Sequence, residues 1–214
     1  MVKRILFQGD TITDALRSRE NEQYAGHGYA TMAKGIIGLD YPMQYECFNR
    51  GISGNRIVDV YARIKSDIIN LKPDYMSILI GINDVWHEYG SQNGVDAEKF
   101  EKIYGMLIEE VKEALPDIKI MILEPFVLKA SATASNANYD DLYPIFRSET
   151  EKRAAASRRI AEKYGLTFVE LMHLFDERYD PEQPGYWLHD GVHPTAAGHT
   201  LIAREWVKAF ESIK

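Results

Sequence analysis

The chain has 214 residues, of which 45% are apolar and 27% charged, the size and composition of one ordinary globular α/β domain. Its net charge of −7 argues against nucleic acid and anionic membrane surfaces as partners, since both attract clustered lysine and arginine. A single cysteine, Cys47, excludes an internal disulfide. We therefore expect a single domain over residues 1–214.

The first residues show no sign of a targeting segment. The apolar run Ile5-Leu6-Phe7 is shorter than the roughly 7 residues that a signal peptide needs. No stretch approaches the roughly 20 apolar residues of a membrane span. These features favour a cytoplasmic protein with no membrane partner.

Short apolar runs alternate with longer amphipathic runs along the whole chain. We predict strands at residues 3–8, 44–48, 75–80, 119–123 and 167–171, since these runs are rich in β-forming residues and bounded by turn formers. Helical spacing of apolar residues predicts helices at 29–37, 57–71, 96–115 and 142–164, and a last one from about Thr195. Asp96 is suited to begin its helix and Pro116 to end it. The alternation predicts an α/β fold with a parallel sheet covered by helices on both faces.

Four short motifs carry most of the chemical information. They are Gly9-Asp10-Thr11, Gly51-Ile52-Ser53-Gly54-Asn55, Gly81-Ile82-Asn83-Asp84 and Asp190-Gly191-Val192-His193. The first three each follow a predicted strand, and ligands of open parallel sheets bind beyond the carboxyl ends of the strands. The fourth precedes the last helix and can return to the same edge, so we expect all four motifs to meet there.

The first and last motifs contain the residue types of a hydroxyl-nucleophile triad. Asp190 can orient His193, which would act as general base toward the hydroxyl of Thr11 and then as general acid toward the leaving group. A threonine in this position can also simply cap a helical turn, and the Asp190–His193 pair can belong to an ordinary surface loop. Sequence alone leaves these alternatives open.

Two further residues are candidates for stabilising an oxyanion. The side-chain amide of Asn83 and the backbone N–H of Gly51 can both donate to developing negative charge at a strand end. Either residue could instead serve only the geometry of its turn.

Taken in order, the four motifs resemble those of the SGNH (GDSL-type) esterase and acylhydrolase superfamily, over nearly the whole chain. The resemblance implies a three-layer αβα, flavodoxin-like sandwich with five parallel strands. It implies a catalytic triad of Thr11, Asp190 and His193, an oxyanion hole formed by Thr11, Gly51 and Asn83, and no cofactor or metal.

Thr11 departs from the family pattern, which has serine at the nucleophile position. Threonine keeps the hydroxyl but adds a methyl group and restricts rotation about χ1. An extra methyl in a tight site typically costs about 1–3 kcal/mol, or roughly 10- to 200-fold in rate if the transition state bears all of it. We therefore expect a weakened or inactive enzyme.

Within the superfamily the chain looks most like the carbohydrate acetylesterases of the acetylxylan type. Residues expected to bind substrate at the rim are Trp86, Tyr186, Trp187 and His189, although aromatic residues also serve core packing or oligomer contacts. The expected substrate is a small acylated molecule, an acetylated sugar first. Thioesters and lysophospholipids remain alternatives, and the aromatic loops are compatible with a homo-oligomer.

Two rival functions come from other classes. A metallophosphoesterase would gather metals with Asp10, Asn83, Asp84 and His193, but the chain has no spare histidine cluster to complete the ligands. A non-catalytic glycan-binding relative of an esterase is the second rival, and the threonine at position 11 favours it.

Overall fold

The computed structural model describes residues 2–214 as an α/β fold built on a five-stranded parallel sheet. The strands lie in the order β2-β1-β3-β4-β5. Their bounds are Lys3–Gly9 (β1), Tyr45–Asn49 (β2), Tyr75–Leu79 (β3), Lys119–Leu123 (β4) and Thr167–Val169 (β5). The predicted fold class and all five strands are confirmed, and Met1, within the expected domain 1–214, lies outside the described residues.

Strand β5 ends two residues before the predicted position because the chain turns there into a short helix. Glu124 Oε2 accepts the backbone N–H groups of Leu171 (2.8 Å) and Met172 (2.9 Å). These bonds take the two N–H groups away from a strand ladder and start α8 (Met172–Asp176).

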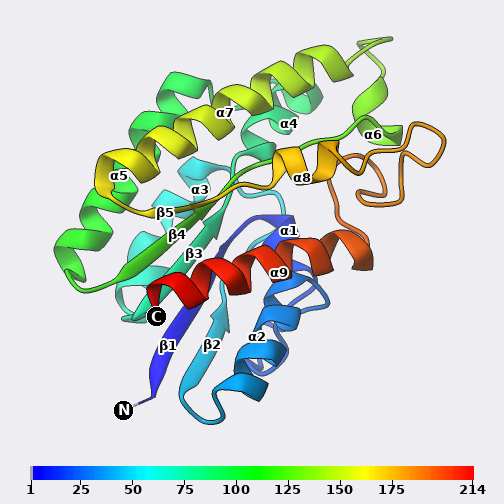
Figure 1. Ribbon diagram of the computed structural model, residues 1–214. Helices are drawn as coiled ribbons and strands as arrows, with labels where there is room; N and C mark the ends of the chain where they lie inside the picture. The colour runs from blue at the N-terminus through cyan, green and yellow to red at the C-terminus, as the bar shows by residue number, and fades with distance from the viewer. Residues whose placement is uncertain (1) are drawn as a thin grey trace.

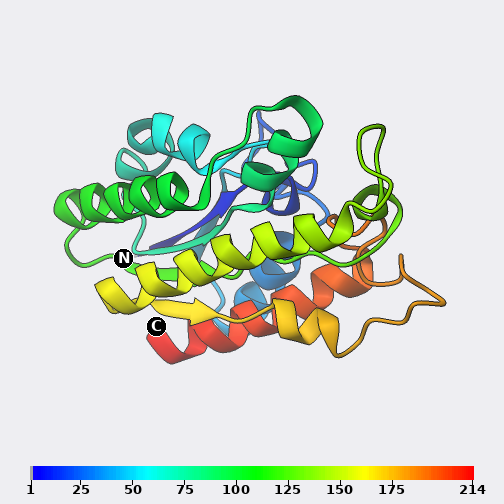
Figure 2. The same cartoon turned by 90° about the horizontal axis from the view of Figure 1, so that it is seen from above.

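Helices cover both faces of the sheet (Figures 1 and 2). One face carries α2 (Tyr29–Asp40) and α9 (Ala196–Ile213), whose buried side chains include Tyr29, Trp206 and Phe210. The other carries α3 (Ile57–Ala62), α5 (Ala97–Ala114) and α7 (Tyr143–Tyr164). The central strands are buried on both faces, which explains their continuous apolar sequence.

Two predicted helix starts agree with the observed caps. Asp96 Oδ1 accepts the N–H of Lys99 at 2.8 Å at the start of α5, and Thr195 Oγ1 accepts that of Gly198 at 3.3 Å at the start of α9. The helix predicted over 57–71 is divided instead, with α3 followed by the π-helical turn η1 (Lys65–Ile69).

Four short helices were not predicted: α1 (Thr11–Asp14), α4 (Ile82–Ser91), α6 (Ser131–Ala134) and α8. Helix α4 begins directly after Gly81, whose φ of 130° turns the chain out of β3. Asn83 therefore lies in the first turn of a helix, not in an open turn. No helix within residues 2–214 combines the length and the apolar character that crossing a membrane requires.

The strand order places one crevice at the centre of the molecule. Strands β1 and β3 are neighbours, with Gly9 paired to Leu79, and the chain leaves them in opposite directions, β1 toward β2 and β3 toward β4. Open sheets bind ligands at such a switch point. The first motif begins with the last residue of β1, and the third begins two residues after β3 ends.

Candidate active site

Segments from four parts of the chain border one cavity of about 290 Å³ at this crevice. Thr11 begins α1 directly after β1, Ser53 and Gly54 lie in the loop after β2, Asn83 lies at the start of α4, and His193 precedes α9. The remaining lining residues are mainly apolar or aromatic: Ile12, Ile82, Trp86, His87 and Val192. Topology thus brings nucleophile, base and amide candidates to the same hollow.

Asp190 and His193 form a tightly hydrogen-bonded pair. Asp190 Oδ2 lies 2.7 Å from His193 Nδ1, and Asp190 Oδ1 accepts the backbone N–H groups of Val192 (2.9 Å) and His193 (2.8 Å). The carboxylate therefore fixes both the loop and the ring. With Nδ1 as donor to Asp190, the lone pair of His193 lies on Nε2, where a general base needs it.

The charges of the two residues support each other. Burial opposes ionisation of Asp190, but hydrogen bonds from His193 and from two backbone N–H groups outweigh it and hold the pKa of Asp190 well below its usual range. The same hydrogen bond raises the pKa of His193, against the opposite effect of burial. Asp190 is thus a permanent anion that stabilises an imidazolium at position 193.

The hydroxyl of Thr11 is hydrogen-bonded to the loop that follows β2. Thr11 Oγ1 lies 3.0 Å from Ser53 Oγ and accepts the N–H of Gly54 at 3.1 Å. Within residues 2–214 it forms no hydrogen bond with His193. Nucleophile and base candidates thus border the same cavity without being joined in this conformation.

The backbone N–H of Thr11 donates to no group in the described part of the chain. Asp10 caps α1 by accepting the N–H of Ile12 at 2.9 Å, which leaves the N–H at the first helical position unused. This unused donor lies at the residue that carries the candidate nucleophile.

The predicted role of Gly51 as an oxyanion donor does not agree with the geometry. Its N–H donates to Asn49 Oδ1 at 2.9 Å, and Gly51 does not border the cavity. Glycine is needed there for another reason, since a Cβ would lie 2.3 Å from the backbone nitrogen of Asp14. Gly51 allows the loop after β2 to pack against α1.

Gly54, which sequence reasoning missed, takes the position at the cavity instead. It borders the hollow, has a φ of 80°, and directs its N–H to Thr11 Oγ1. The turn residues Ser53-Gly54-Asn55 were visible in the sequence, but a sequence does not say which of two nearby glycines turns its N–H outward.

Asn83 and Trp86 border the same hollow from α4. Asn83 Nδ2 donates one hydrogen to the carbonyl of Asn55 at 3.1 Å, which fixes the amide and leaves its second hydrogen for a ligand. The Trp86 ring lies 6.3 Å from that of His193 and packs edge-on against Phe146 at 5.7 Å. Trp86 is therefore both a cavity wall and a packing residue.

The other predicted substrate residues divide into two groups. His189 borders a second cavity next to His193, and the two rings stack at 5.7 Å. Tyr186 and Trp187 border a separate hollow, where Trp187 Nε1 donates to the carbonyl of Arg178 at 2.9 Å. The latter two therefore do not contact the cavities that contain Thr11 and His193.

Two of the four metal ligands considered for a metallophosphoesterase, Asp10 and Asp84, are not available at the cavity. Asp10 and Asp84 are buried and border neither hollow, and burial raises the pKa of each to about 7. Asp84 accepts the N–H of Ile57, which ties α4 to α3. His189, Asp190 and His193 bring potential ligand atoms within 4.8 Å, but both Asp190 oxygens already accept hydrogen bonds.

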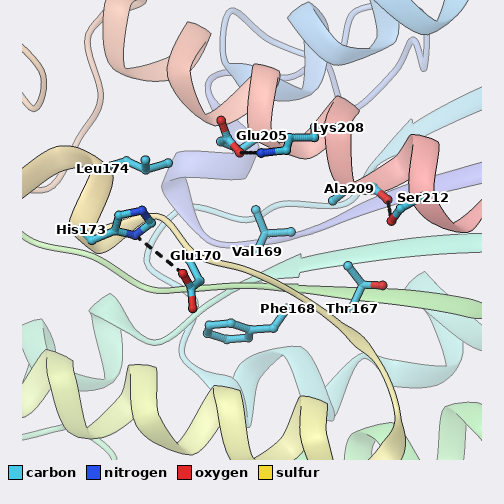
Figure 3. Close-up of a pocket in the computed structure, with 10 residues that line it drawn as sticks. All are labelled: Thr167, Phe168, Val169, Glu170, His173, Leu174, Glu205, Lys208, Ala209 and Ser212. Atoms are coloured by element: carbon cyan, nitrogen blue, oxygen red, sulfur yellow. Dashed lines mark hydrogen bonds and ion pairs between the residues drawn. The ribbon is translucent and has the colours of Figure 1, made fainter.

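A larger hollow, of about 510 Å³, lies elsewhere, between β5 and the C-terminal half of α9 (Figure 3). Its ionisable side chains lie in pairs: His173 is 4.0 Å from Glu170, and Lys208 is 3.7 Å from Glu205. It contains no nucleophile held beside a base, so its size does not make it the reaction site.

Comparisons with known proteins cover most of the chain. Residues 7–201 match the GDSL-like Lipase/Acylhydrolase family. The acetylxylan esterase of Geobacillus stearothermophilus is 32% identical over 225 aligned residues, with 97% of each chain covered.

Solved structures show the same fold. A protein from Parabacteroides merdae that is described as a GDSL-like lipase superposes with a TM-score of 0.86 at 32% identity, over 99% of this chain and 98% of that one. The crystal structure of the Geobacillus stearothermophilus acetylxylan esterase gives a TM-score of 0.82 at 30% identity, over 97% of this chain and 93% of that one.

Proposed function

The chain belongs to the GDSL-like lipase/acylhydrolase family, and from that membership we propose that it removes short acyl groups, acetyl first, from carbohydrate esters. The predicted family is thereby confirmed, and with it the coarser activity of an acylhydrolase. The observation that carries the finer proposal is the shared cavity, which the Asp190-oriented His193 and the hydroxyl-bearing Thr11 both border.

In the proposed mechanism the Thr11 hydroxyl attacks the ester carbonyl while His193 Nε2 accepts its proton. His193 then donates that proton to the departing alcohol, which leaves an acyl-threonine. Water, activated by the same imidazole, hydrolyses the acyl-threonine and restores the enzyme. Asp190 holds the ring and stabilises its positive charge throughout.

Three donors are suited to stabilise the oxyanion. They are the backbone N–H of Thr11, the backbone N–H of Gly54 and the second amide hydrogen of Asn83. All three residues border the cavity, so a carbonyl oxygen placed there meets donors fixed before the reaction. Gly54 replaces Gly51 in this assignment because Gly54 borders the cavity and Gly51 does not. The N–H of Gly54 is bonded to the Thr11 hydroxyl and becomes free when that hydroxyl moves to attack, whereas the N–H of Gly51 is held by the side chain of Asn49.

For attack, the Thr11 hydroxyl has to leave Ser53 and turn toward His193. Rotation about χ1 also moves the methyl group, which serine lacks. We infer from this that threonine slows the reaction without removing its chemistry.

The acetyl preference rests on the size and walls of the cavity. About 290 Å³ bordered by Ile82, Trp86 and Val192 accommodates a short acyl group next to the oxyanion donors but not an extended lipid chain. The sugar preference rests on similarity to an acetylxylan esterase over 97% of the chain. Lysophospholipids, with their long acyl chains, are less well matched by this volume, and thioesters of short acyl groups are an alternative substrate class.

The alternative is a glycan-binding protein without catalysis. The observation that favours it is the absence, in residues 2–214, of a hydrogen bond between Thr11 and His193. An enzyme and a binding protein differ in whether acetate is released, even in one turnover.

Acetate release from a chromogenic acetyl ester and from an acetylated xylooligosaccharide tests the proposal. We expect slow hydrolysis by the native chain, loss of at least about 100-fold in His193→Ala, and no change in His173→Ala, which lies at the remote hollow. Glycan binding with no acetate released at stoichiometric enzyme would establish the alternative.

A further inference from the structure

A second cavity, of about 260 Å³, also borders the candidate nucleophile. It shares Thr11, Ile12, Ser53 and His193 with the first cavity but is not bordered by Gly54 or Asn83. An ester bound for attack has its carbonyl oxygen at the oxyanion donors and its alkoxy oxygen near His193, which must protonate it. The second cavity is therefore the space left for the alcohol half, an inference that rests on the proposed function.

One wall of this cavity is His199, a buried side chain that the mechanism does not use. It lies in the first turn of α9 and is only 5% exposed. Its Nδ1 accepts the backbone N–H of Tyr29 at 3.1 Å, so Nδ1 carries no proton and the neutral ring carries its proton on Nε2. Burial, with His27 and His193 nearby, lowers the pKa of His199 to about 4, which keeps the ring neutral.

The Nε2–H of His199 is a donor without a protein partner among the described residues. The Nδ1–Cε1 edge of the ring is against Gly28, where an added Cβ would lie 2.9 Å from Cε1 and 3.2 Å from Nδ1. That edge is closed to ligands. His199 Nε2 is not one of the side-chain atoms that are both fully buried and without a hydrogen-bond partner. It is therefore the polar atom that His199 offers to the cavity.

The surrounding walls combine hydrogen-bonding and apolar groups. The His27 ring meets His199 edge-on at 6.4 Å, and His189 stacks on His193. Leu16, which is 84% exposed, and Pro194 add apolar surface at the same hollow. A sugar ring needs this combination, because it has hydroxyls around its edge and apolar C–H groups on its faces.

We propose that the second cavity binds the polyhydroxylated alcohol half of the ester, with His199 Nε2–H as a fixed hydrogen-bond donor to a hydroxyl or ring oxygen. Because the backbone of Tyr29 sets the tautomer, the donor is present before the ligand arrives. His199 is thus a residue that selects a hydroxylated leaving group over an apolar one of similar size.

Side-chain ¹⁵N NMR of the full-length protein tests the proposal without relying on turnover. In the free protein we expect His199 to show a protonated Nε2 and an unprotonated Nδ1 at pH 7. Methyl β-D-xylopyranoside should shift the His199 Nε2–H signal saturably, whereas cyclohexanol, which has a ring of similar size and one hydroxyl, should shift it far less. His173, at the remote hollow, is the internal control.

A His199→Phe variant identifies the signal and should weaken xyloside binding about tenfold, as expected for one lost hydrogen bond, while His173→Phe should leave the affinity unchanged. A protonated Nδ1 in the free protein, or equal shifts with both alcohols, would overturn the proposal even if the phenylalanine variant fails to fold. Ester hydrolysis without a shift at His199 refutes the role of His199 in the second cavity but not the proposed catalytic function. A shift at His199 without hydrolysis supports it and refutes the catalytic function.

Discussion

Thr11 Oγ1 lies 3.0 Å from Ser53 Oγ, so the candidate nucleophile is hydrogen-bonded to a second hydroxyl at the mouth of the same cavity. The N–H of Gly54 reinforces this position at 3.1 Å. Asp190 meanwhile holds His193 independently at 2.7 Å. The nucleophile candidate and the Asp190–His193 pair are therefore each held in place at one cavity. The orientation of the Thr11 hydroxyl decides whether they act together.

Replacing Thr11 with serine should raise activity. Serine keeps the hydroxyl and lacks the methyl group that restricts rotation, so kcat/KM for a chromogenic acetyl ester should rise roughly 10- to 200-fold. Steady-state kinetics on purified native and Thr11→Ser protein provide the measurement.

Thr11→Val is the matched control, because valine has nearly the shape of threonine without the hydroxyl. It should abolish hydrolysis and leave the melting temperature close to that of the native chain. Hydrolysis by the valine variant at the native rate would show that Thr11 is not the nucleophile.

Replacing Ser53 with alanine should release the Thr11 hydroxyl. One neutral hydrogen bond contributes about 0.5–1.5 kcal/mol, so kcat should rise roughly 2- to 12-fold if rotation away from Ser53 limits the reaction. The gain should be smaller in a Thr11→Ser background, where rotation is already free.

The native chain, Thr11→Ser, Ser53→Ala and the variant with both changes form a double-mutant cycle. The quantity to measure is the coupling free energy between positions 11 and 53. Additive effects would show that the contact at 3.0 Å does not restrain the nucleophile.

The pH dependence of kcat/KM should report the Asp190–His193 pair. Only neutral His193 accepts a proton, so the rate rises with pH as the imidazolium deprotonates. The hydrogen bond that His193 donates to Asp190 raises the pKa of His193, which places the midpoint of this rise above the ordinary histidine value of about 6.5.

Asp190→Asn removes the negative charge that raises the pKa of His193. The midpoint should therefore move to lower pH, and the plateau rate should fall by roughly 10³- to 10⁴-fold, since asparagine favours the wrong tautomer. His173→Gln serves as the control for an unrelated histidine. An unmoved midpoint in the asparagine variant would mean that another group titrates in the profile.

Sequence alone was sufficient for the framework because its signals are local and repeated. Buried strands such as β4 read as unbroken apolar runs, and the caps at Asp96 and Thr195 follow directly from side-chain chemistry. Helix α4 was missed because Gly81, Asn83 and Asp84 look like turn residues, whereas Asp84 in fact bonds to the distant N–H of Ile57. Such a long-range partner cannot be read from nearby residues.

The details of the site depend on orientations that residue types do not specify. Tyr186 and Trp187 lie just before the fourth motif in the sequence, which suggested a place at the rim. The carbonyl of Arg178 instead holds Trp187 in another hollow. His199 carries no functional signal in the sequence, because only the fold brings it to Tyr29. Choosing between Gly51 and Gly54 requires knowing where each N–H points.

These two glycines should respond differently to alanine. At Gly51 a Cβ would lie 2.3 Å from the backbone of Asp14, so Gly51→Ala should lower the melting temperature by several degrees, the effect of a few kcal/mol of overpacking. At Gly54 a Cβ meets only His87 Nε2 at 3.9 Å, but the φ of 80° strains alanine by about 1–2 kcal/mol and tilts the N–H away from the oxyanion.

Gly54→Ala should therefore lower kcat by about 10-fold or more with only a modest loss of stability. Gly51→Ala should lower stability strongly but leave kcat largely unchanged when the folded protein is assayed below its melting temperature. Thermal unfolding and esterase kinetics on both variants, each in the more active Thr11→Ser background, provide the comparison. If Gly51→Ala proves stable but inactive while Gly54→Ala keeps full activity, the oxyanion donor lies at position 51, and the loop must rearrange to free its N–H from Asn49.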